Sequence, residues 1–430
     1  MKTFNLAIII FMTLLMMSCE KKSDIVTNSK DYNAFLESND NKSIDFAKNE
    51  IDFWQEKFDA SPNQITYLSQ IASNYSKLFE ITGTIQYLVK AEELLLKSNE
   101  AFRYTQVGTI RSLARNYITQ HRFKEALGLA NKALEIGEGM KETQKLLFDV
   151  QMELGNYKEA EKWLKATQSY TEFDFFIRLA KWNDHLGDLP TAISLMEKAT
   201  KKAENSENKN LMVWSYSNLG DMYGHAGKIK DSYKYYLKTL ALDPHNSYAL
   251  KGIAWIAFSH EKNTKEANRI IDVLVKKHHS PDLYLLKAEI AEYENKNVEK
   301  EKNITNYFYM LQENDYGVMY NKYNALIFSD DKSTAKIALS IAEQEIKNRP
   351  TPDSYDLLAW AYYNLGAYKK AFEIAQKHVV GKSFEPELNY HLAMIYKANN
   401  KNSLIAPIKK DLLMSTFELG PTYTQKIEKL

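Results

Sequence analysis

The sequence has few glycines and prolines and almost no net charge. Its 15 glycines and 9 prolines among 430 residues amount to about half the usual share of these two residues. This shortage disfavours a β-sandwich, a collagen-like chain and a loop-rich disordered chain, so most of the chain is expected to be helical. Lysine and arginine number 56 against 55 acidic residues, which leaves no net field to attract a nucleic-acid backbone. Nucleic acid is therefore not an expected partner.

Cysteine occurs once, at position 19, so no disulfide or thiolate metal cluster can form within one molecule. Residues 1–18 begin with the basic Lys2 and continue as an apolar run that ends just before Ser18. This run is shorter than the roughly 20 apolar residues of a membrane span, and polar residues follow it, as is typical of an export signal.

The segment Leu15-Met16-Met17-Ser18-Cys19 resembles the cleavage box of bacterial lipoproteins, although Met16 stands where most such boxes have leucine. The resemblance implies that residues 1–18 are a lipoprotein signal peptide, that Cys19 is lipidated, and that residues 19–30 form a flexible tether. With Glu20 after the cysteine, the expected location is the outer membrane of a Gram-negative cell envelope, on either its periplasmic or its outer side. An ordinary secretory signal that contains a cysteine is the alternative.

Residues 65–419 repeat with a period of about 34 residues. In residues 107–140, apolar residues first recur at helical spacing, as Ile110, Leu113 and Tyr117, and small residues then follow as Ala126 and Ala130. This pattern predicts two amphipathic helices whose small side chains allow close packing. About ten such units are expected, at residues 65–98, 107–140, 141–174, 173–206, 213–246, 247–281, 282–315, 316–350, 352–385 and 386–419. One residue is inserted near Asn263 in the unit 247–281.

The best units resemble the tetratricopeptide repeat. Residues 213–246 carry its pattern as Tyr216, Leu219, Gly220, Tyr223, Gly227, Ser232, Tyr236, Thr239 and Pro244. The resemblance implies an all-α fold, a right-handed α-solenoid of about ten stacked helix-turn-helix repeats, in which each unit buries its stripe against its neighbours. Residues 31–64 are expected to form N-terminal capping helices, and residues 420–430 a frayed C-terminal tail.

Motifs of catalysis or metal binding are not expected. The glycines at 220, 224 and 227 lack the spacing of a phosphate-binding loop, and the repeat pattern explains them. His260-Glu261 has no second histidine four residues later, and His278-His279 lies in a connection between units. The chain is therefore predicted to be no enzyme, with no cofactor and no metal.

The family resemblance further implies which first-helix positions face a concave, peptide-binding groove. The charged candidates lie in the N-terminal units: Arg111, Arg115, Lys145, Asp149, Lys181 and Asp184. The aromatic candidates lie further on: Trp214, Tyr248, Trp255, Phe258, Trp360, Tyr363 and Tyr390. Flat aromatic faces suit stacking on a ligand, but they also suit filling gaps between helices.

These features together predict a membrane-anchored scaffold that binds a protein or peptide partner in an envelope complex. The alternative is a glycan-binding or nutrient-binding outer-membrane lipoprotein that uses the groove aromatics. The oligomeric state is left open.

Overall fold

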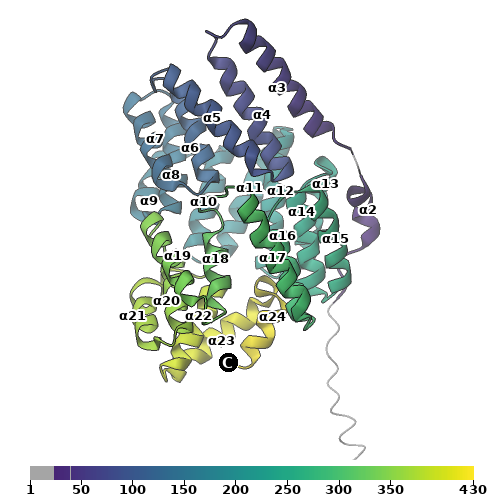
Figure 1. The fold of residues 1–430 in the computed structure, drawn as a ribbon, viewed down its shortest axis with the longest axis vertical. Coiled ribbons are helices and arrows are strands. Elements are labelled where there is room, and N and C mark those ends of the chain that lie inside the picture. Colours follow the sequence, from purple (N-terminus) through teal and green to yellow (C-terminus); the bar gives the residue numbers. More distant parts are fainter. Residues whose placement is uncertain (1–23, 39) are drawn as a thin grey trace, which may run out of the picture.

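All regular structure in the described part of the chain is helical, and that part contains no strand. The computed structural model describes residues 24–38 and 40–430, so the expected signal peptide and Cys19 lie outside the described residues. Figure 1 shows most helices of the described residues packed side by side, from α3 to α24. The fold is an α-solenoid.

The helices follow one another with short connections. In chain order they are α2 (Ser29–Glu37), α3 (Lys42–Ala60), α4 (Thr66–Thr82), α5 (Ile85–Ala101), α6 (Val107–Thr119), α7 (Phe123–Ile136), α8 (Met140–Glu153), α9 (Tyr157–Ala166), α10 (Phe173–His185), α11 (Leu189–Asn205), α12 (Lys209–His225), α13 (Ile229–Leu242), α14 (Ser247–Trp255), the π-helix η1 (Ile256–His260), α15 (Thr264–Lys277), α16 (Asp282–Tyr293), α17 (Asn297–Glu313), α18 (Asn321–Ser329), α19 (Ala335–Asn348), α20 (Pro352–Asn364), α21 (Tyr368–His378), α22 (Pro386–Ala398), the short η2 (Asn402–Leu404), α23 (Ile405–Met414) and α24 (Thr416–Glu428).

Consecutive helices pack as pairs, and each of the ten ranges suggested as repeat units holds one pair, from α4–α5 to α22–α23. In the pair α6–α7, Ile110 and Leu113 are fully buried, and so are Ala126 and Ala130 of the second helix. The alanines let the backbones approach closely, while the larger residues fill the space between neighbouring pairs. The buried residues of the helix pairs are thus the residues that recur in the sequence pattern.

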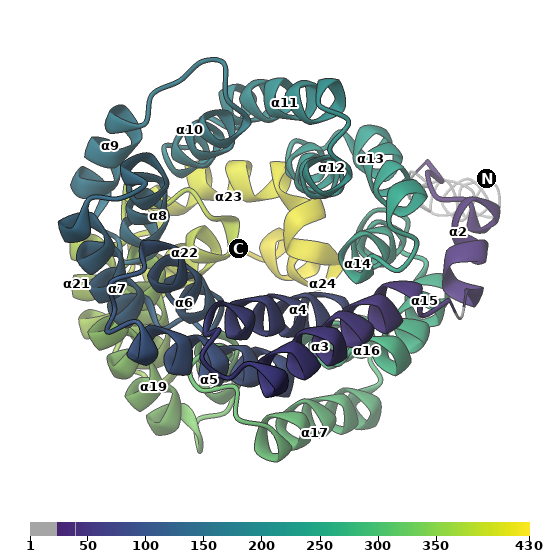
Figure 2. The same ribbon diagram turned by 90° about the horizontal axis from the view of Figure 1, so that it is seen from above.

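The pairs wind into a superhelix whose successive turns touch. The His278 ring lies 3.1 Å from the Ile81 carbonyl oxygen, 197 residues earlier in the chain. Further along, the Asn348 amide donates to the His121 carbonyl, 227 residues earlier, at 3.3 Å. Seen from above, the helices form a ring in which α4, α6, α12 and α14 lie inside and α7, α11, α13 and α15 lie outside (Figure 2). One turn therefore takes roughly 200 residues, or about six pairs.

A glycine permits the contact between turns at its tightest point. Gly83 has φ +68°, and a Cβ there would lie 2.9 Å from the His279 carbonyl oxygen. The His279 amide donates to the Thr82 carbonyl oxygen at 2.6 Å across the same contact. Only glycine combines that backbone conformation with so close an approach.

The N-terminal segment crosses to the far end of the first turn. Helix α3 packs on α4, but α2 packs on α13 and α15 on the outside of the ring, where Tyr32 is fully buried (Figure 2). Before α2, the amides of Val26 and Thr27 donate to Glu261 at 2.7 and 2.6 Å. Residues 26–28 are thus bound to the solenoid, in contrast to the expected free tether, and α2 does not cap the first repeat. The first turn of the superhelix ends near α13–α15, so the edge of these helices lies close enough to cover the apolar face of α2.

The C-terminal segment fills the middle of the ring. Figure 2 shows α23 and α24 inside the superhelix, with the C-terminus at its centre. Residues 420–430 belong mostly to α24 and are packed, with Ile427 fully buried, so the expectation of a frayed tail was wrong. The cause is a set of apolar side chains that need cover: Tyr423 and Ile427 lie four residues apart on one helical face, and Leu419 precedes the kink at Gly420. They pack with Tyr390 and Leu412.

Replacing Tyr32 with alanine should detach α2. Tyr32 is fully buried and its hydroxyl donates to Glu266 at 2.6 Å, so removing the ring should cost about 3–5 kcal/mol. Hydrogen exchange should speed up in α13 and α15 and stay unchanged in α6–α9, because stability in a solenoid is local. Phe46→Ala on α3, which removes an exposed ring, should have little effect. Uniform acceleration along the whole chain would contradict this account of α2.

Candidate functional site

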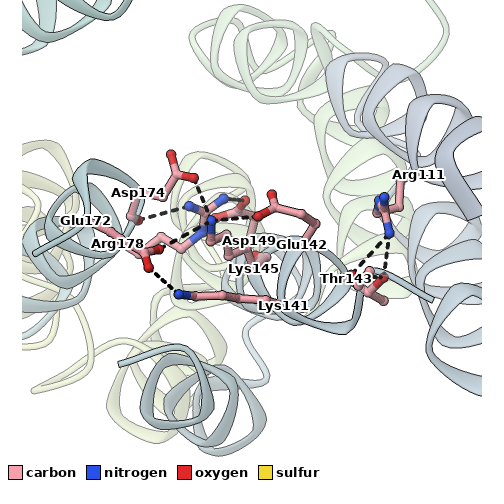
Figure 3. Close-up of polar contacts among 10 residues, drawn as sticks. Arg111, Lys141, Glu142, Thr143, Lys145, Asp149, Glu172, Asp174 and Arg178 are labelled. Atoms are coloured by element: carbon pink, nitrogen blue, oxygen red, sulfur yellow. Dashed lines mark hydrogen bonds and ion pairs between the residues drawn. The ribbon is translucent and has the colours of Figure 1, made fainter. Parts of the chain in front are cut away.

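The charged groove candidates of the N-terminal units lie on three adjacent inner helices, α6, α8 and α10. Three of them, Lys145, Asp149 and Lys181, form ion pairs between α8 and α10. Lys145 is 5% exposed, and its ammonium lies 2.8 Å from Glu142 and 2.7 Å from Asp174 (Figure 3). Burial alone would lower the pKa of Lys145, but the hydrogen bonds to Asp174 and Glu142 outweigh it and raise that pKa. This lysine joins α8 to the start of α10.

Asp149 makes the matching contact one helical turn further along α8. It accepts from Arg178 of α10 at 2.6 Å, and the same guanidinium donates to the Lys145 carbonyl oxygen (Figure 3). Lys181 then pairs with Glu153 at 2.7 Å. The sequence analysis missed Asp174, Arg178 and Glu153. The signal that could have found the first two is a spacing of 29 residues, one helix pair, from Lys145 to Asp174 and from Asp149 to Arg178.

Arg111 is also held, whereas Arg115 is free among the described residues. Arg111 donates to Thr143 at 3.2 Å and to the carbonyl oxygens of Glu138 and Gly139, which tie α6 to the start of α8 (Figure 3). Arg115 is exposed on the same helix and makes no side-chain hydrogen bond or ion pair in the described part of the chain. Although the side chain reaches solvent, the surrounding wall partly removes its hydration, and this effect, followed by the positive charge of Arg111, lowers its pKa. Arg115 stays a cation at neutral pH. Arg115 is therefore available to a partner.

Asp184, the last charged candidate, faces the C-terminal helix. Burial and the negative charge of Glu418 raise its pKa, while His225 acts in the opposite direction. His225 lies 3.3 Å from Glu418, so α12 is linked to α24 at this point. Asp184 is thus close to the inserted helix, one turn along α10 from Lys181.

The aromatic candidates fall into three groups. Trp214 and Tyr248 are 41% and 51% exposed, Trp255, Trp360 and Tyr363 are half-buried, and Phe258 and Tyr390 are buried. Phe258 belongs to the core because η1 is a π-helix, which inserts one residue into the turn and rotates the following side chains. It does not line a groove.

Helix α24 covers the half-buried aromatics. The Trp255 indole donates to the Phe417 carbonyl oxygen at 3.0 Å, and Ser259 donates to the same oxygen at 2.6 Å. Tyr390 packs edge-on against Tyr423 with ring centroids 5.0 Å apart, and Trp360 packs in the same cluster. These aromatics fill space between the wall and the chain's own C-terminal helix, so they do not form an open stacking surface.

A cavity of about 440 Å³ remains beside α24, lined by α12, α13, α14, α16, α18 and α22. Of the predicted groove residues, only Tyr248 and Trp255 reach it. The sequence analysis missed the other residues that line the cavity. They come together where the first turn of the superhelix meets the second, and the spacing of residues within a repeat does not predict that contact. Its charged and titratable side chains are Asp221, Tyr236, Tyr248, Lys251, Asp282, Glu289, Lys322, Tyr323 and Glu387.

Most of these charges are paired. Lys251 forms an ion pair with Asp282, and Lys322 lies 3.1 Å from Glu387. Asp221 accepts hydrogen bonds from the hydroxyls of Tyr236 and Tyr248, which carry no charge. Glu289 makes no hydrogen bond or ion pair within residues 24–38 and 40–430 of the structure, and burial, followed by the negative charge of Glu292, raises its pKa from 4.5 to about 8.

The described residues contain no group of three or more histidine, cysteine or acidic side chains placed to hold a metal ion. His278 instead contacts the Ile81 carbonyl between the two turns. Within the same part of the chain, no helix combines the length and the apolar character that crossing a membrane requires.

Replacing Glu289 with glutamine should stabilise the protein increasingly as the pH rises. The folded carboxyl keeps its proton up to about pH 8, whereas the unfolded one loses it near 4.5, so folding stability is full below pH 4.5 and falls as the pH rises to 8. The glutamine variant lacks this loss, and its melting temperature should exceed that of the native chain by on the order of 3 °C at pH 8 and by little at pH 5. Thermal melts across this range measure the difference. Glu301→Gln, at an exposed position on α17, is the control, and a constant difference at all pH values would refute the explanation.

Comparison with known proteins identifies the repeat type. Residues 117–173, from the end of α6 to the start of α10, match the family described as tetratricopeptide repeat. No curated protein matches the sequence. The match and the consecutive helix pairs support the resemblance to this family.

Several solved structures are similar in outline. Human IFIT1, as a dimer with PPP-AAAA, is 14% identical with a TM-score of 0.48 over 73% of this chain and 71% of that one. A Rap protein complexed with Competence and Sporulation Factor is 13% identical, with a TM-score of 0.44 over 57% and 75% of the two chains. A tetratricopeptide repeat protein from Parabacteroides merdae is 16% identical, with a TM-score of 0.38 over 55% and 93%. These distant likenesses carry no conclusion about ligands, and the identified feature is the tetratricopeptide repeat of residues 117–173.

Proposed function

We propose that this chain is a membrane-anchored tetratricopeptide scaffold that binds a protein or peptide segment on the inner wall of its superhelix, within a bacterial cell-envelope complex, without catalysis of its own. The observation that carries the proposal is the free Arg115 on a wall where Lys145, Asp149 and Lys181 are already paired. A solenoid presents such a wall rigidly, because each inner helix is fixed by its neighbours. Selectivity then comes from the few groups that are not already engaged.

The inner wall favours a protein ligand over a glycan. Stacking on sugar rings needs open aromatic faces, but Trp255 and Trp360 are covered by α24 and by neighbouring side chains. The exposed Trp214 already packs edge-on against Phe173. The remaining free group, Arg115, suits an acidic or hydrogen-bonding segment of a polypeptide.

A lipid anchor on Cys19 would leave the inner wall accessible. The described chain begins at Asp24, and α2 lies on the outside of the ring, bound to α13 and α15. The described chain therefore starts on the outer face of the ring. The lipobox-like segment and the outward position of α2 support the same arrangement, a superhelix attached by its side to the membrane.

Membrane attachment has a direct test. Cys19→Ala should move the protein from the membrane fraction to the soluble fraction of the cells, because two or three acyl chains would be lost. Ser18→Ala keeps a small residue before the cysteine and should leave the protein in the membrane fraction. Unchanged membrane association of Cys19→Ala would disprove the lipid anchor.

Partner binding is tested by co-purification from crosslinked membranes. The native chain should capture a defined envelope protein, and Arg115→Ala should reduce its recovery at least fivefold, in line with loss of a charged hydrogen bond of about 1.5–3 kcal/mol. Lys198→Ala, at an exposed position on the outer helix α11, should capture it as well as the native chain does. Equal recovery with all three proteins would exclude the inner wall of α6 as the binding surface.

A further inference from the structure

The cavity beside α24 carries more negative than positive charge. Four carboxylates line it, on Asp221, Asp282, Glu289 and Glu387, against the two ammonium groups of Lys251 and Lys322. Each ammonium group is already paired with one carboxylate, Lys251 with Asp282 and Lys322 with Glu387. The other two acidic groups, Asp221 and Glu289, form no ion pair among the described residues, although the positive charge of Lys426 acts on Glu289 from α24.

Glu289 makes no hydrogen bond or ion pair among the described residues although it is half-buried. Its carboxylate points to where Gly420 of α24 passes, and a Cβ on that glycine would lie 2.6 Å from it. The indole of Trp255 lies on the other side of the same glycine position, 3.0 Å from the Cβ site. A carboxylate enclosed in this way is costly unless it is protonated or meets a cation.

We propose that this cavity binds a basic group, a primary amine or a guanidinium, on a segment of the protein partner that enters the lumen. The proposal rests on the proposed function for its source of the group, a lysine or arginine side chain. The cation pairs with Glu289 and reaches Asp221 across the cavity, whose lining also includes the aromatic side chains of Tyr248 and Tyr323. The volume of about 440 Å³ is within the range of sites that enclose a ligand of this size.

The chain's own C-terminal helix shows how a segment in the lumen is held. Lys426 of α24 lies 3.1 Å from Glu292, on the same inner helix as Glu289 and one turn further along. The ammonium group of Lys426 also lies 5.1 Å from the centre of the Tyr423 ring. An inserted lysine, an acidic residue of α16 and an aromatic ring thus already occur together here. Glu289 is the acidic residue one turn before Glu292 on α16. The residue of α24 that faces it is Gly420, which has no side chain to pair with it.

The charged residues further up the wall do not offer this chemistry. The Lys145 ladder is the set of ion pairs between α8 and α10, and in it Lys145, Asp149 and Lys181 each have a charged partner at 2.6 to 2.7 Å. Arg115 is free but is itself a cation, so it repels a basic group. Among these places the cavity at Glu289 is the one that favours a cation.

Titration of the whole chain with small probes tests the site. The probes are Nα-acetyl-arginine amide and Nα-acetyl-lysine amide, with Nα-acetyl-citrulline amide as a neutral isostere, followed by Trp fluorescence and calorimetry at pH 8. The basic probes should saturate with a Kd of about 1 mM, and citrulline should bind at least tenfold more weakly. Glu289→Gln should weaken the basic probes at least tenfold, and Asp221→Asn severalfold. Glu301→Gln on α17 should bind as the native chain does, and circular dichroism checks that each variant is folded.

The outcomes separate this site from the proposed function. Equal binding of citrulline and arginine probes, or unchanged binding by Glu289→Gln, overturns the cation site even if an envelope partner is captured. Binding of the probes that depends on Glu289, with no partner captured, keeps the site and removes the scaffold role. Spermidine is titrated in parallel, and spermidine binding at least a hundredfold tighter than the acetylated amino acids would overturn the assignment to a protein side chain.

Discussion

Each helix pair of this chain leaves an apolar stripe that only the next pair can cover, and the shape of the molecule follows from that constraint. Stacking satisfies it along the middle of the chain, where Ala126 and Ala130 of α7 let the helices pack without gaps. The ends have no further repeat to use. At the N-terminus α2 crosses to α13 and α15, and at the C-terminus α24 turns into the lumen, so both ends are buried on surfaces that the superhelix itself creates.

The winding of the helix pairs into a superhelix also determines which charged side chains of the interior need a partner. Side chains that would be solvated on an open solenoid face one another across a narrow lumen, where a charge without a partner is costly. Lys145, Asp149 and Lys181 are paired between adjacent inner helices for this reason. Against this background, Arg115 and Glu289 are two groups without an ion pair in the described chain, one basic and one acidic, at separate places on the wall. The lumen thus offers two recognition points of opposite sign.

The repeats could be predicted from the sequence because their cause is local. Ile110, Leu113 and Tyr117 are close in the chain and lie on one helical face, so the spacing alone indicates how they pack. The contact of Gly83 with His279 and the cavity at Glu289 depend instead on how many pairs complete a turn, which no local pattern encodes. The Lys145 ladder is intermediate, since its partners lie on adjacent inner helices, but Lys145 and Asp174 are 29 residues apart and so do not occupy the same position of the 34-residue repeat. The packing of residues 420–430 could not be foreseen, because the surface that receives Ile427 exists only after the second turn has formed.

The aromatic residues show why repeat position alone does not assign a binding surface. Counting along the repeat places Phe258 in the groove, but the π-helix after Trp255 adds a residue to the turn and moves Phe258 into the core. Trp255 keeps its inward position, yet its indole is used by Phe417 of the inserted helix. The aromatic rings of the second turn therefore hold α24 in place, and discrimination between ligands is left to charged groups. A segment that binds this wall is selected by where its own charges fall relative to Arg115 and Glu289.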